Sequence, residues 1–107
     1  MSLSNELSGV LLRRFKKKEM GWQRLWVVYS NFSLFFFKRA HDEKYLANLP
    51  IIGYKIDRPG ADDAITKEFV FKLSYKSHIY FFAADSQYSL ERWMNVIRDT
   101  SCSESRN

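Results

Sequence analysis

A change in hydrophobic periodicity at Asp85 limits the folds that are open to this chain. Before Asp85, short segments rich in Phe, Tyr and β-branched residues alternate with polar turns, a pattern that is typical of β-strands. After Asp85, apolar residues recur at positions i, i+3, i+4 and i+7, which is one face of a helix. The residues of this face are Leu90, Trp93, Met94 and Ile97. The sequence therefore predicts a mainly β protein that ends in one amphipathic helix.

Seven segments before the helix have the composition of strands. They span residues 9–15, 22–29, 32–39, 45–49, 51–56, 68–74 and 78–83, and the helix spans residues 87–100. Pro50 falls between two of these segments, where its missing N–H marks a sheet edge or a break. Seven strands can bury the apolar face of a helix only by curling into an antiparallel sandwich or partly open barrel, whose open end the helix caps.

The length of 107 residues corresponds to one domain, which we place at residues 8–100 with flexible ends at residues 1–7 and 101–107. Hydrophobic residues make up 46% of the chain, which is enough to form a core without disulfides or metals. The single cysteine, Cys102, excludes an internal disulfide and a multi-cysteine zinc site. The lack of disulfides and of a recognisable signal peptide predicts an intracellular protein.

Positive charge is concentrated around the loop between the first two predicted strands. Residues 13–24 contain six basic side chains and one acidic side chain, Glu19, so their local charge equals the +5 of the whole chain. The basic residues are Arg13, Arg14, Lys16, Lys17, Lys18 and Arg24. We call residues 13–24 the basic hairpin. Its charge predicts an anionic partner, which is a membrane, a nucleic acid or an acidic protein surface.

Three segments, in their order and spacing, resemble a pleckstrin homology (PH) domain over residues 8–100. They are the opening Gly9-Val10-Leu11-Leu12-Arg13, the aromatic strand at residues 22–28, and the single tryptophan of the last helix, Trp93. The stretches at residues 21–28, 49–53, 68–73 and 80–83 are similar to those in the C-terminal PH domains of FERM, RhoGEF and pleckstrin-domain proteins. This resemblance implies a seven-stranded antiparallel PH fold that is capped by the helix.

Lipid-binding members of this family hold inositol phosphates with a Lys or Arg late in the first strand and a Lys/Arg-x-Arg pattern early in the second. The resemblance places Arg13, Gln23 and Leu25 at these positions, so only the first position is basic. It also turns Gln23, Leu25 and Val27 inward, whereas strand alternation alone leaves the choice of inward face open. Arg24 then points outward. We therefore expect no tight, headgroup-selective lipid binding.

The cations of the basic hairpin still predict weak, salt-sensitive contact with an anionic membrane. Each Lys or Arg near such a surface contributes up to ~1 kcal/mol, and a total of ~4 kcal/mol corresponds to millimolar affinity. The predicted residues that bind an anionic lipid or a protein partner are Arg13, Arg14, Lys16, Lys17, Lys18, Trp22 and Arg24. Trp22 is the expected apolar anchor, because it begins the second strand beside the loop and need not be fully buried, and the alternative is that it folds back over the barrel rim. A further alternative is that the hairpin is only a solvated tip.

The resemblance implies a non-catalytic module that regulates or positions the exchange domain of a Rho-family guanine-nucleotide exchange factor. The implied partners are the exchange (DH) domain or other neighbouring domains of the same protein, and Rho GTPase signalling complexes. The isolated domain is expected to be a cytoplasmic monomer that is peripheral to the plasma membrane or cytoskeleton. The alternative is a phosphoinositide-binding PH domain that targets a membrane.

Other chemistries receive little support from the sequence. His41 and His78 lack metal-ligand spacing, the four glycines are isolated, and the carboxylate pairs at residues 42–43 and 62–63 fall in loops. We therefore expect no catalytic residue, no metal and no cofactor. Nucleic-acid binding would need the aromatic residues of the second strand to stack on bases. No RNP-type motif accompanies these residues, so we expect no nucleic-acid partner.

Overall fold

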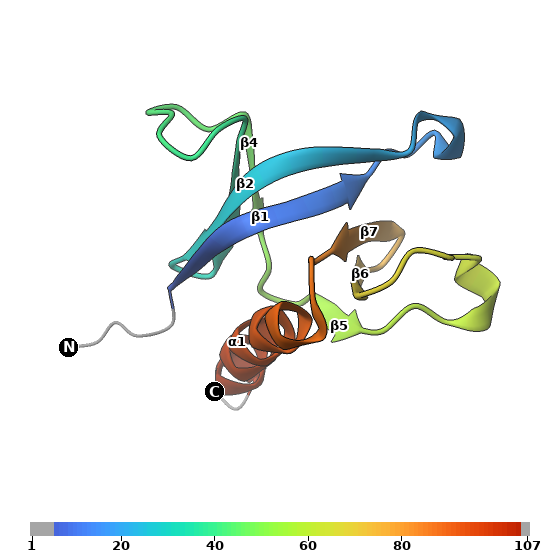
Figure 1. Ribbon diagram of the computed structural model, residues 1–107. Coiled ribbons are helices and arrows are strands. Elements are labelled where there is room, and N and C mark those ends of the chain that lie inside the picture. Colours follow the sequence, from blue (N-terminus) through green and yellow to red (C-terminus); the bar gives the residue numbers. More distant parts are fainter. Residues whose placement is uncertain (1–5, 106–107) are drawn as a thin grey trace.

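The computed structural model describes residues 6–105. Within them, seven strands form one antiparallel sheet in the order β4-β3-β2-β1-β7-β6-β5, and one helix follows (Figure 1). The strands are β1 (Leu7–Arg14), β2 (Trp22–Ser30), β3 (Ser33–Phe37), β4 (Ala47–Pro50), β5 (Lys55–Asp57), β6 (Val70–Tyr75) and β7 (His78–Ala83). The helix is α1 (Gln87–Ser105), and two short 3-10 helices lie at η1 (Lys18–Met20) and η2 (Ala61–Asp63). The predicted fold class is confirmed.

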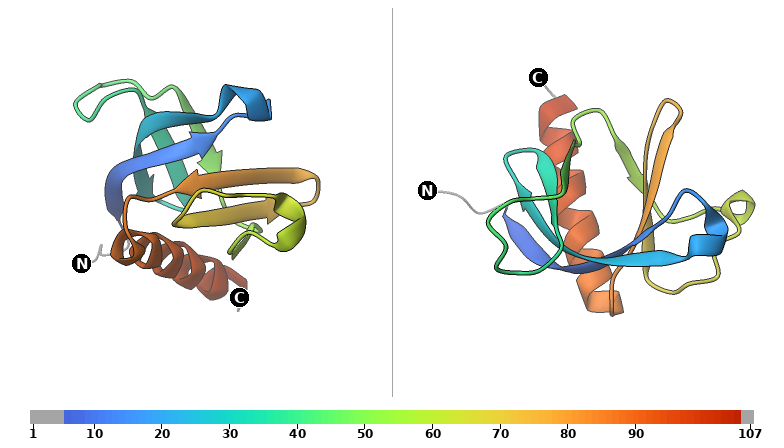
Figure 2. Two further views of the ribbon diagram at one scale, coloured as in Figure 1. Left: turned by 45° about the vertical axis from the view of Figure 1, so that its right-hand side comes forward. Right: turned by 90° about the horizontal axis from the view of Figure 1, so that it is seen from above.

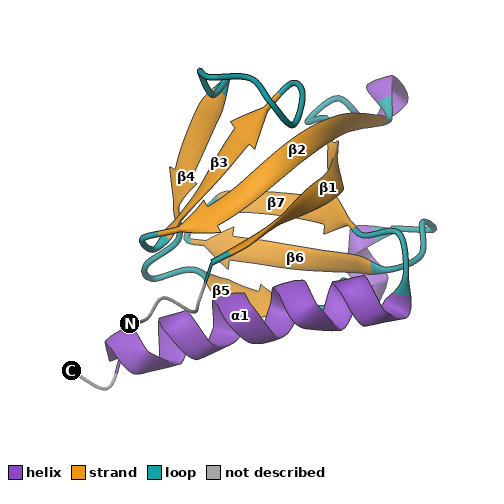
Figure 3. Cartoon of the chain, turned by 60° about the vertical axis from the view of Figure 1, so that its left-hand side comes forward, coloured by secondary structure: helices purple, strands orange, loops and turns teal. Residues whose placement is uncertain are grey.

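The sheet folds around one core. Strands β1 to β4 make one half and strands β5 to β7 make the other, and the two halves face each other (Figure 2). Helix α1 runs along the open side and packs against β5 and β6 (Figure 3). Strand β1 pairs with β2 along its whole length, and it pairs with β7 through two residues. The sheet is therefore curled, as a seven-stranded sheet must be to bury the apolar face of a helix.

The core is formed by the inward side chains of both halves and by one face of α1. Its buried residues include Leu11, Leu25, Val27, Leu34, Phe36, Phe71, Leu73, Phe82, Leu90, Trp93, Met94 and Ile97. All four predicted helix residues are at most 4% exposed, so the predicted apolar face is confirmed. In β2, Leu25 and Val27 are buried whereas Arg24 is exposed, which confirms the predicted inward row.

Trp93 has the largest of the fully buried side chains. A Cβ added at Gly9 would lie 3.9 Å from Cζ2 of the Trp93 ring, so the ring sits close to the backbone of β1. The start of the helix is capped by Ser86, whose Oγ accepts a hydrogen bond of 3.1 Å from the N–H of Ser89. The close approach of the Trp93 ring to Gly9 thus sets the position of α1 along β1.

Several strand predictions are wrong at their ends. Strand β4 begins at Ala47 and not at residue 45, and β6 begins at Val70 and not at residue 68, because Phe69 has φ of 60°. Phe32 does not begin the third strand, because Asn31 and Phe32 form the turn between β2 and β3 with φ of 53° and 64°. A two-residue hairpin turn of this hand requires positive φ at both central residues, and this requirement overrides the strand preference of Phe. The predicted strand at residues 51–56 is shortened to β5, because the N–H of Tyr54 bonds to the carbonyl of Ile51 and Gly53 has φ of 94°. Pro50 lies in the edge strand β4, as predicted.

The ends of the fold extend beyond the predicted limits of residues 8 and 100. Strand β1 begins at Leu7, and α1 continues to Ser105 because no Pro or Gly follows Thr100. Flexibility at residues 1–7 and 101–107 stays a prediction, and residues 1–5 and 106–107 lie outside the described part of the chain. Among residues 6–105, no helix is long and apolar enough to cross a membrane.

Removal of the Trp93 ring should strongly destabilise the domain. Trp93→Ala leaves a cavity in the core and is expected to lower the free energy of unfolding by roughly 3–5 kcal/mol. Chemical denaturation followed by circular dichroism measures this change. Arg92→Ala, at the exposed neighbouring position, is the control and should change the stability by less than ~0.5 kcal/mol. A folded Trp93→Ala variant with the parent melting temperature would contradict the placement of α1.

Candidate anion-binding and partner-binding site

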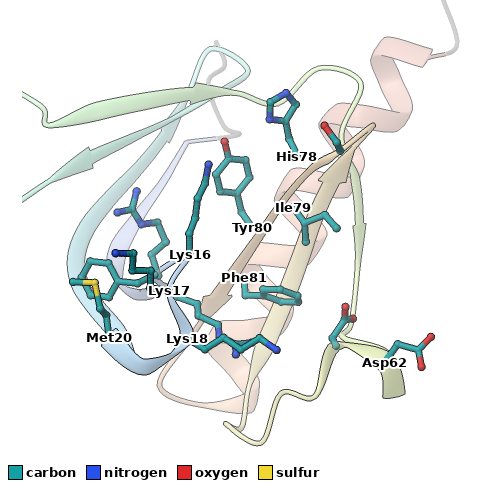
Figure 4. Close-up of a pocket in the computed structure, with 14 residues that line it drawn as sticks. Lys16, Lys17, Lys18, Met20, Asp62, His78, Ile79, Tyr80 and Phe81 are labelled. Atoms are coloured by element: carbon teal, nitrogen blue, oxygen red, sulfur yellow. The ribbon is translucent and has the colours of Figure 1, made fainter.

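A pocket opens where β1 and β7 separate. The two strands pair only at Leu12 with Ala83 and at Arg13 with Phe82, and beyond these pairs they diverge. The cavity between them has a volume of about 850 Å³ (Figure 4). Its lining residues are Arg13, Arg14, Phe15, Lys16, Lys17, Lys18, Met20, Asp62, Asp63, Ser77, His78, Ile79, Tyr80 and Phe81. We call this cavity the hairpin pocket, because one wall is the basic hairpin and the other is β7 and the turn before it.

The hairpin pocket is electropositive. Five of its lining residues are predicted cations of the basic hairpin: Arg13, Arg14, Lys16, Lys17 and Lys18. Figure 4 shows the three lysines on the hairpin side of the cavity. In the part of the chain that the structure describes, no carboxylate lies within 4.0 Å of Lys16, Lys17 or Lys18. These three side chains are exposed. Their charge is therefore available to an anion or to an acidic partner.

Asp63 contributes little negative charge to the pocket, because it is already engaged. Its Oδ2 accepts a hydrogen bond of 2.7 Å from the N–H of Gly60, and both carboxylate oxygens lie 3.1 Å from Nζ of Lys72. The pKa of the Asp63 carboxyl is held below its ordinary value, mainly by the hydrogen bond from the Gly60 N–H and next by the hydrogen bond from Lys72. The second acidic residue of the lining, Asp62, is exposed.

The inner row of β1 and β2 carries a single cation. Arg13 lies opposite Gln23, and its Nη2 donates a hydrogen bond of 2.8 Å to Oε1 of Gln23. Leu25, the next residue of the row, is 3% exposed and belongs to the core. Of the three positions that the resemblance assigned to phosphate binding, only Arg13 is therefore basic, and its guanidinium is already held by a neighbour.

The seven predicted site residues divide between two surfaces. Arg13, Arg14 and the three lysines line the hairpin pocket, whereas Trp22 and Arg24 are not part of its lining. Trp22 pairs with Arg14 across the strands and is half-buried, and Nζ of Lys67 lies 5.9 Å from the centre of its ring. Arg24 is exposed on the same side of β2. Trp22 is thus not fully buried, and its role as an anchor stays a prediction.

The opposite wall of the pocket was not predicted from the sequence. Phe81 lies under Arg14, with the guanidinium carbon 5.8 Å from the ring centre. Tyr80 packs beside Tyr54 at a centroid distance of 6.2 Å, and burial followed by the Tyr80 phenol raises the pKa of Tyr54. Of these two phenols, that of Tyr80 lines the pocket and provides it with a hydrogen-bonding group. Met20 is 58% exposed in η1, within the basic hairpin.

The described residues contain no cluster of three or more His, Cys, Asp or Glu side chains that could hold a metal ion. Most of the groups that line the pocket are ammonium, guanidinium, phenol and aromatic groups, beside the carboxylates of Asp62 and Asp63. Such groups bind anions, acidic side chains and apolar anchors through charge, hydrogen bonds and packing. The arrangement is therefore that of a binding site.

The strand order, the closing helix and the pocket beside the first hairpin are those of a known class of small β modules. The PH domain model matches residues 5–101, and the chain belongs to the PH domain family. A solved structure, the PH domain of human pleckstrin homology domain-containing protein family A member 5, superposes with a TM-score of 0.78. That comparison covers 90% of this chain and 76% of the other at 23% sequence identity, which shows the shared fold.

Two curated relatives are similar over nearly the whole chain. The chain is 52% identical over 105 residues to "FERM, ARHGEF and pleckstrin domain-containing protein 2" of Mus musculus, which covers 98% of this chain and 10% of the relative. It is 49% identical over 106 residues to "FERM, ARHGEF and pleckstrin domain-containing protein 1" of Gallus gallus. That alignment covers 99% of this chain and 10% of the relative. The chain thus spans about a tenth of the length of these relatives.

The engaged carboxylate of Asp63 should make the stability of the domain depend on pH. Because its pKa is lower in the folded than in the unfolded chain, its contribution is present above the unfolded pKa and is lost as the pH falls through the folded pKa. Asp63→Asn is expected to lower the free energy of unfolding at pH 7, and the difference from the parent should shrink in acid. Denaturant titrations of the parent and the variant, from pH 7 down into acid, measure this difference in the free energy of unfolding.

The exposed neighbour provides the control for this prediction. Asp62→Asn should change the stability at pH 7 by less than ~0.5 kcal/mol. An Asp63→Asn variant as stable as the parent at pH 7 would show that the contacts with Gly60 and Lys72 do not stabilise the loop before β6.

Proposed function

We propose that this chain is a non-catalytic PH module of a Rho-family guanine-nucleotide exchange factor, where it positions or regulates the exchange domain through contact with neighbouring domains. One observation carries the proposal: the inner phosphate-binding row is incomplete, while the lysines of the basic hairpin are exposed and without a carboxylate partner among the described residues. The printed names of the relatives, which include ARHGEF and pleckstrin domains, support the parent class. PH domains are typically binding modules.

Contact with an anionic membrane is the weaker part of the proposed function. The five cations of the hairpin pocket contribute up to ~1 kcal/mol each near an anionic leaflet, a total of a few kcal/mol. Salt screening and the nearby Glu19 reduce this total. A contribution of ~4 kcal/mol corresponds to millimolar affinity, which orients a protein at a membrane without recruiting it. We place the protein in the cytoplasm, at the periphery of the plasma membrane or cytoskeleton.

Liposome binding should be weak and sensitive to salt. Vesicles rich in phosphatidylserine are expected to retain the domain at low ionic strength and to release it near physiological salt in a sedimentation assay, because the attraction is mainly between charges. The double variant Lys16→Glu/Lys17→Glu should lose this binding. The control variant Lys55→Glu/Arg58→Glu makes the same change in net charge at exposed positions outside the pocket lining. It should retain most of the liposome binding.

The hairpin pocket favours a second candidate, the phosphoinositide-binding PH domain that targets a membrane. Its volume of about 850 Å³ is large enough to hold a small ligand beside five cations. The same assay separates the two candidates when one phosphoinositide at a time is added to the vesicles. Micromolar, salt-resistant binding to one headgroup would support the second candidate and contradict weak electrostatic contact.

Loss of the domain or of its basic hairpin should change nucleotide exchange by the parent protein. Exchange on a Rho-family GTPase is measured for the full-length protein, for a deletion of this domain, and for charge reversal at Arg14, Lys16, Lys17, Lys18 and Arg24. Charges at an interface steer and orient the partner, so each change is expected to alter the exchange rate or the membrane recruitment of the parent. Trp22→Ala should have a similar effect. Unchanged exchange and recruitment in all of these variants would refute the regulatory role.

A further inference from the structure

The outer side of β1, β2 and β3 carries large apolar side chains that the core does not use. They are Val10, Trp26, Val28, Phe35 and Phe37, and we call them the outer aromatic face. Each is partly exposed, and none is among the described residues that form the core cluster or pack against it. Apolar surface that is gathered in one place and left open to solvent marks an interaction site.

The outer aromatic face is continuous across three strands. Val10 lies opposite Trp26, and Trp26 lies opposite Phe37, so the three side chains form one row. Neighbouring strands are ~4.8 Å apart, so the row is ~10 Å wide, which is the diameter of an α-helix with its side chains. Val28 and Phe35 form the next pair along the strands. This width suits one helix.

A loop residue extends the outer aromatic face at its edge. The ring of Tyr45 lies 5.2 Å from that of Phe35 and 6.3 Å from that of Phe37, and Tyr45 itself is 51% exposed. Helix α1 lies on the other side of the sheet, because its buried residues share the core with the inward residues of β1 to β3 (Figure 3). The domain's own helix therefore leaves the outer aromatic face open.

Charge is distributed unevenly along the outer aromatic face. At the end beside the basic hairpin, Arg24 precedes Trp26 by two residues on the same side of β2, and Lys67 lies over Trp22. At the opposite end, Oε2 of Glu6 accepts a hydrogen bond of 2.9 Å from Ser30. An apolar centre with a basic end complements a partner that has an apolar stripe and an acidic end.

We infer that the outer aromatic face docks an amphipathic helix of a protein partner, whose acidic side chains lie over Arg24 and Lys67. The inference rests on the proposed function, because it assigns the apolar anchor for the same contact with a neighbouring domain. Trp26 is the central anchor, since aromatic residues that are buried at the middle of an interface provide most of the binding energy.

Two other occupants fit this surface less well. A second copy of the chain would oppose the cations Arg24 and Lys67 with the Glu6 carboxylate, which is already held by Ser30. A membrane would need apolar side chains that project from the surface, as that of Met20 does in η1 at 58% exposure, whereas Trp26 and Phe37 lie within paired strands. Both occupants remain measurable outcomes of the test.

The test uses the 107-residue chain and two synthetic helical peptides. Both peptides carry leucines at positions i, i+3, i+4 and i+7, and their last turn carries glutamates in one and lysines in the other. NMR spectra should show that the glutamate peptide shifts the indole N–H signal of Trp26 and the amides of β1 to β3. The lysine peptide should bind at least ~10-fold more weakly. This comparison tests the proposal on the unchanged chain.

A double variant tests the anchor itself. Trp26→Thr/Phe37→Thr keeps residues that favour strands and should weaken binding of the glutamate peptide by at least ~10-fold. Ile52→Thr removes an exposed apolar side chain that belongs neither to this face nor to the lining of the hairpin pocket, and it should leave binding unchanged. Equal binding of the two peptides, or shifts confined to the hairpin pocket, would overturn the inference. Self-association of the parent chain, or its binding to liposomes, would also overturn the inference if Trp26→Thr/Phe37→Thr abolished it and the control variant did not.

Exchange by the full-length parent separates this inference from the proposed function. Both stand when Trp26→Thr/Phe37→Thr and charge reversal of the basic hairpin each change the exchange rate. When charge reversal alters exchange and the threonine variant does not, the inference fails and the proposed function stands. When deletion of the whole domain has no effect, the proposed function fails as well, whatever the peptides bind.

Discussion

The junction between β1 and β7 is the contact on which the rest of the structure depends. Two residue pairs bring the halves of the sheet together, and the core closes behind them with Trp93 against the backbone of Gly9. Beyond these pairs the strands diverge and the hairpin pocket opens. Longer pairing would place Lys16 and Lys17 against β7 and fill the space between them. The short junction thus gives the domain both a closed core and an open pocket.

Strand alternation sends neighbouring residues of the basic hairpin to different surroundings. Arg13 faces inward and is held by Gln23, whereas Arg14 faces outward over Phe81. The same rule buries Leu25 and leaves Trp26 on the outer side. One short stretch of sequence therefore contributes to the pocket, to the core and to the outer aromatic face.

The features that the sequence predicted well depend on residues that are close together in the chain. The helical face of α1 follows from the spacing of Leu90, Trp93, Met94 and Ile97, and the cations of the basic hairpin are nearly consecutive. The errors arose where local backbone geometry overrides side-chain preference. Phe32 has a strong strand preference and still occupies a turn position with positive φ, and Gly53 interrupts a segment rich in isoleucine. The second wall of the pocket and the contact of Lys67 with Trp22 could not be predicted, because they require strand pairing between distant parts of the chain.

Because the hairpin pocket is built from distant segments, it forms late during the synthesis of the chain. One wall of the hairpin pocket comes from the start of the chain, and the other comes from β7, which is separated from it by five further strands. Contacts between such distant segments form slowly, since the closure of a long loop costs conformational entropy before the contact is made. A ribosome-bound fragment that ends before β7 already carries every lysine of the basic hairpin and has no pocket. Any ligand that needs both walls is therefore bound only by the finished domain, and partly made chains cannot compete for it.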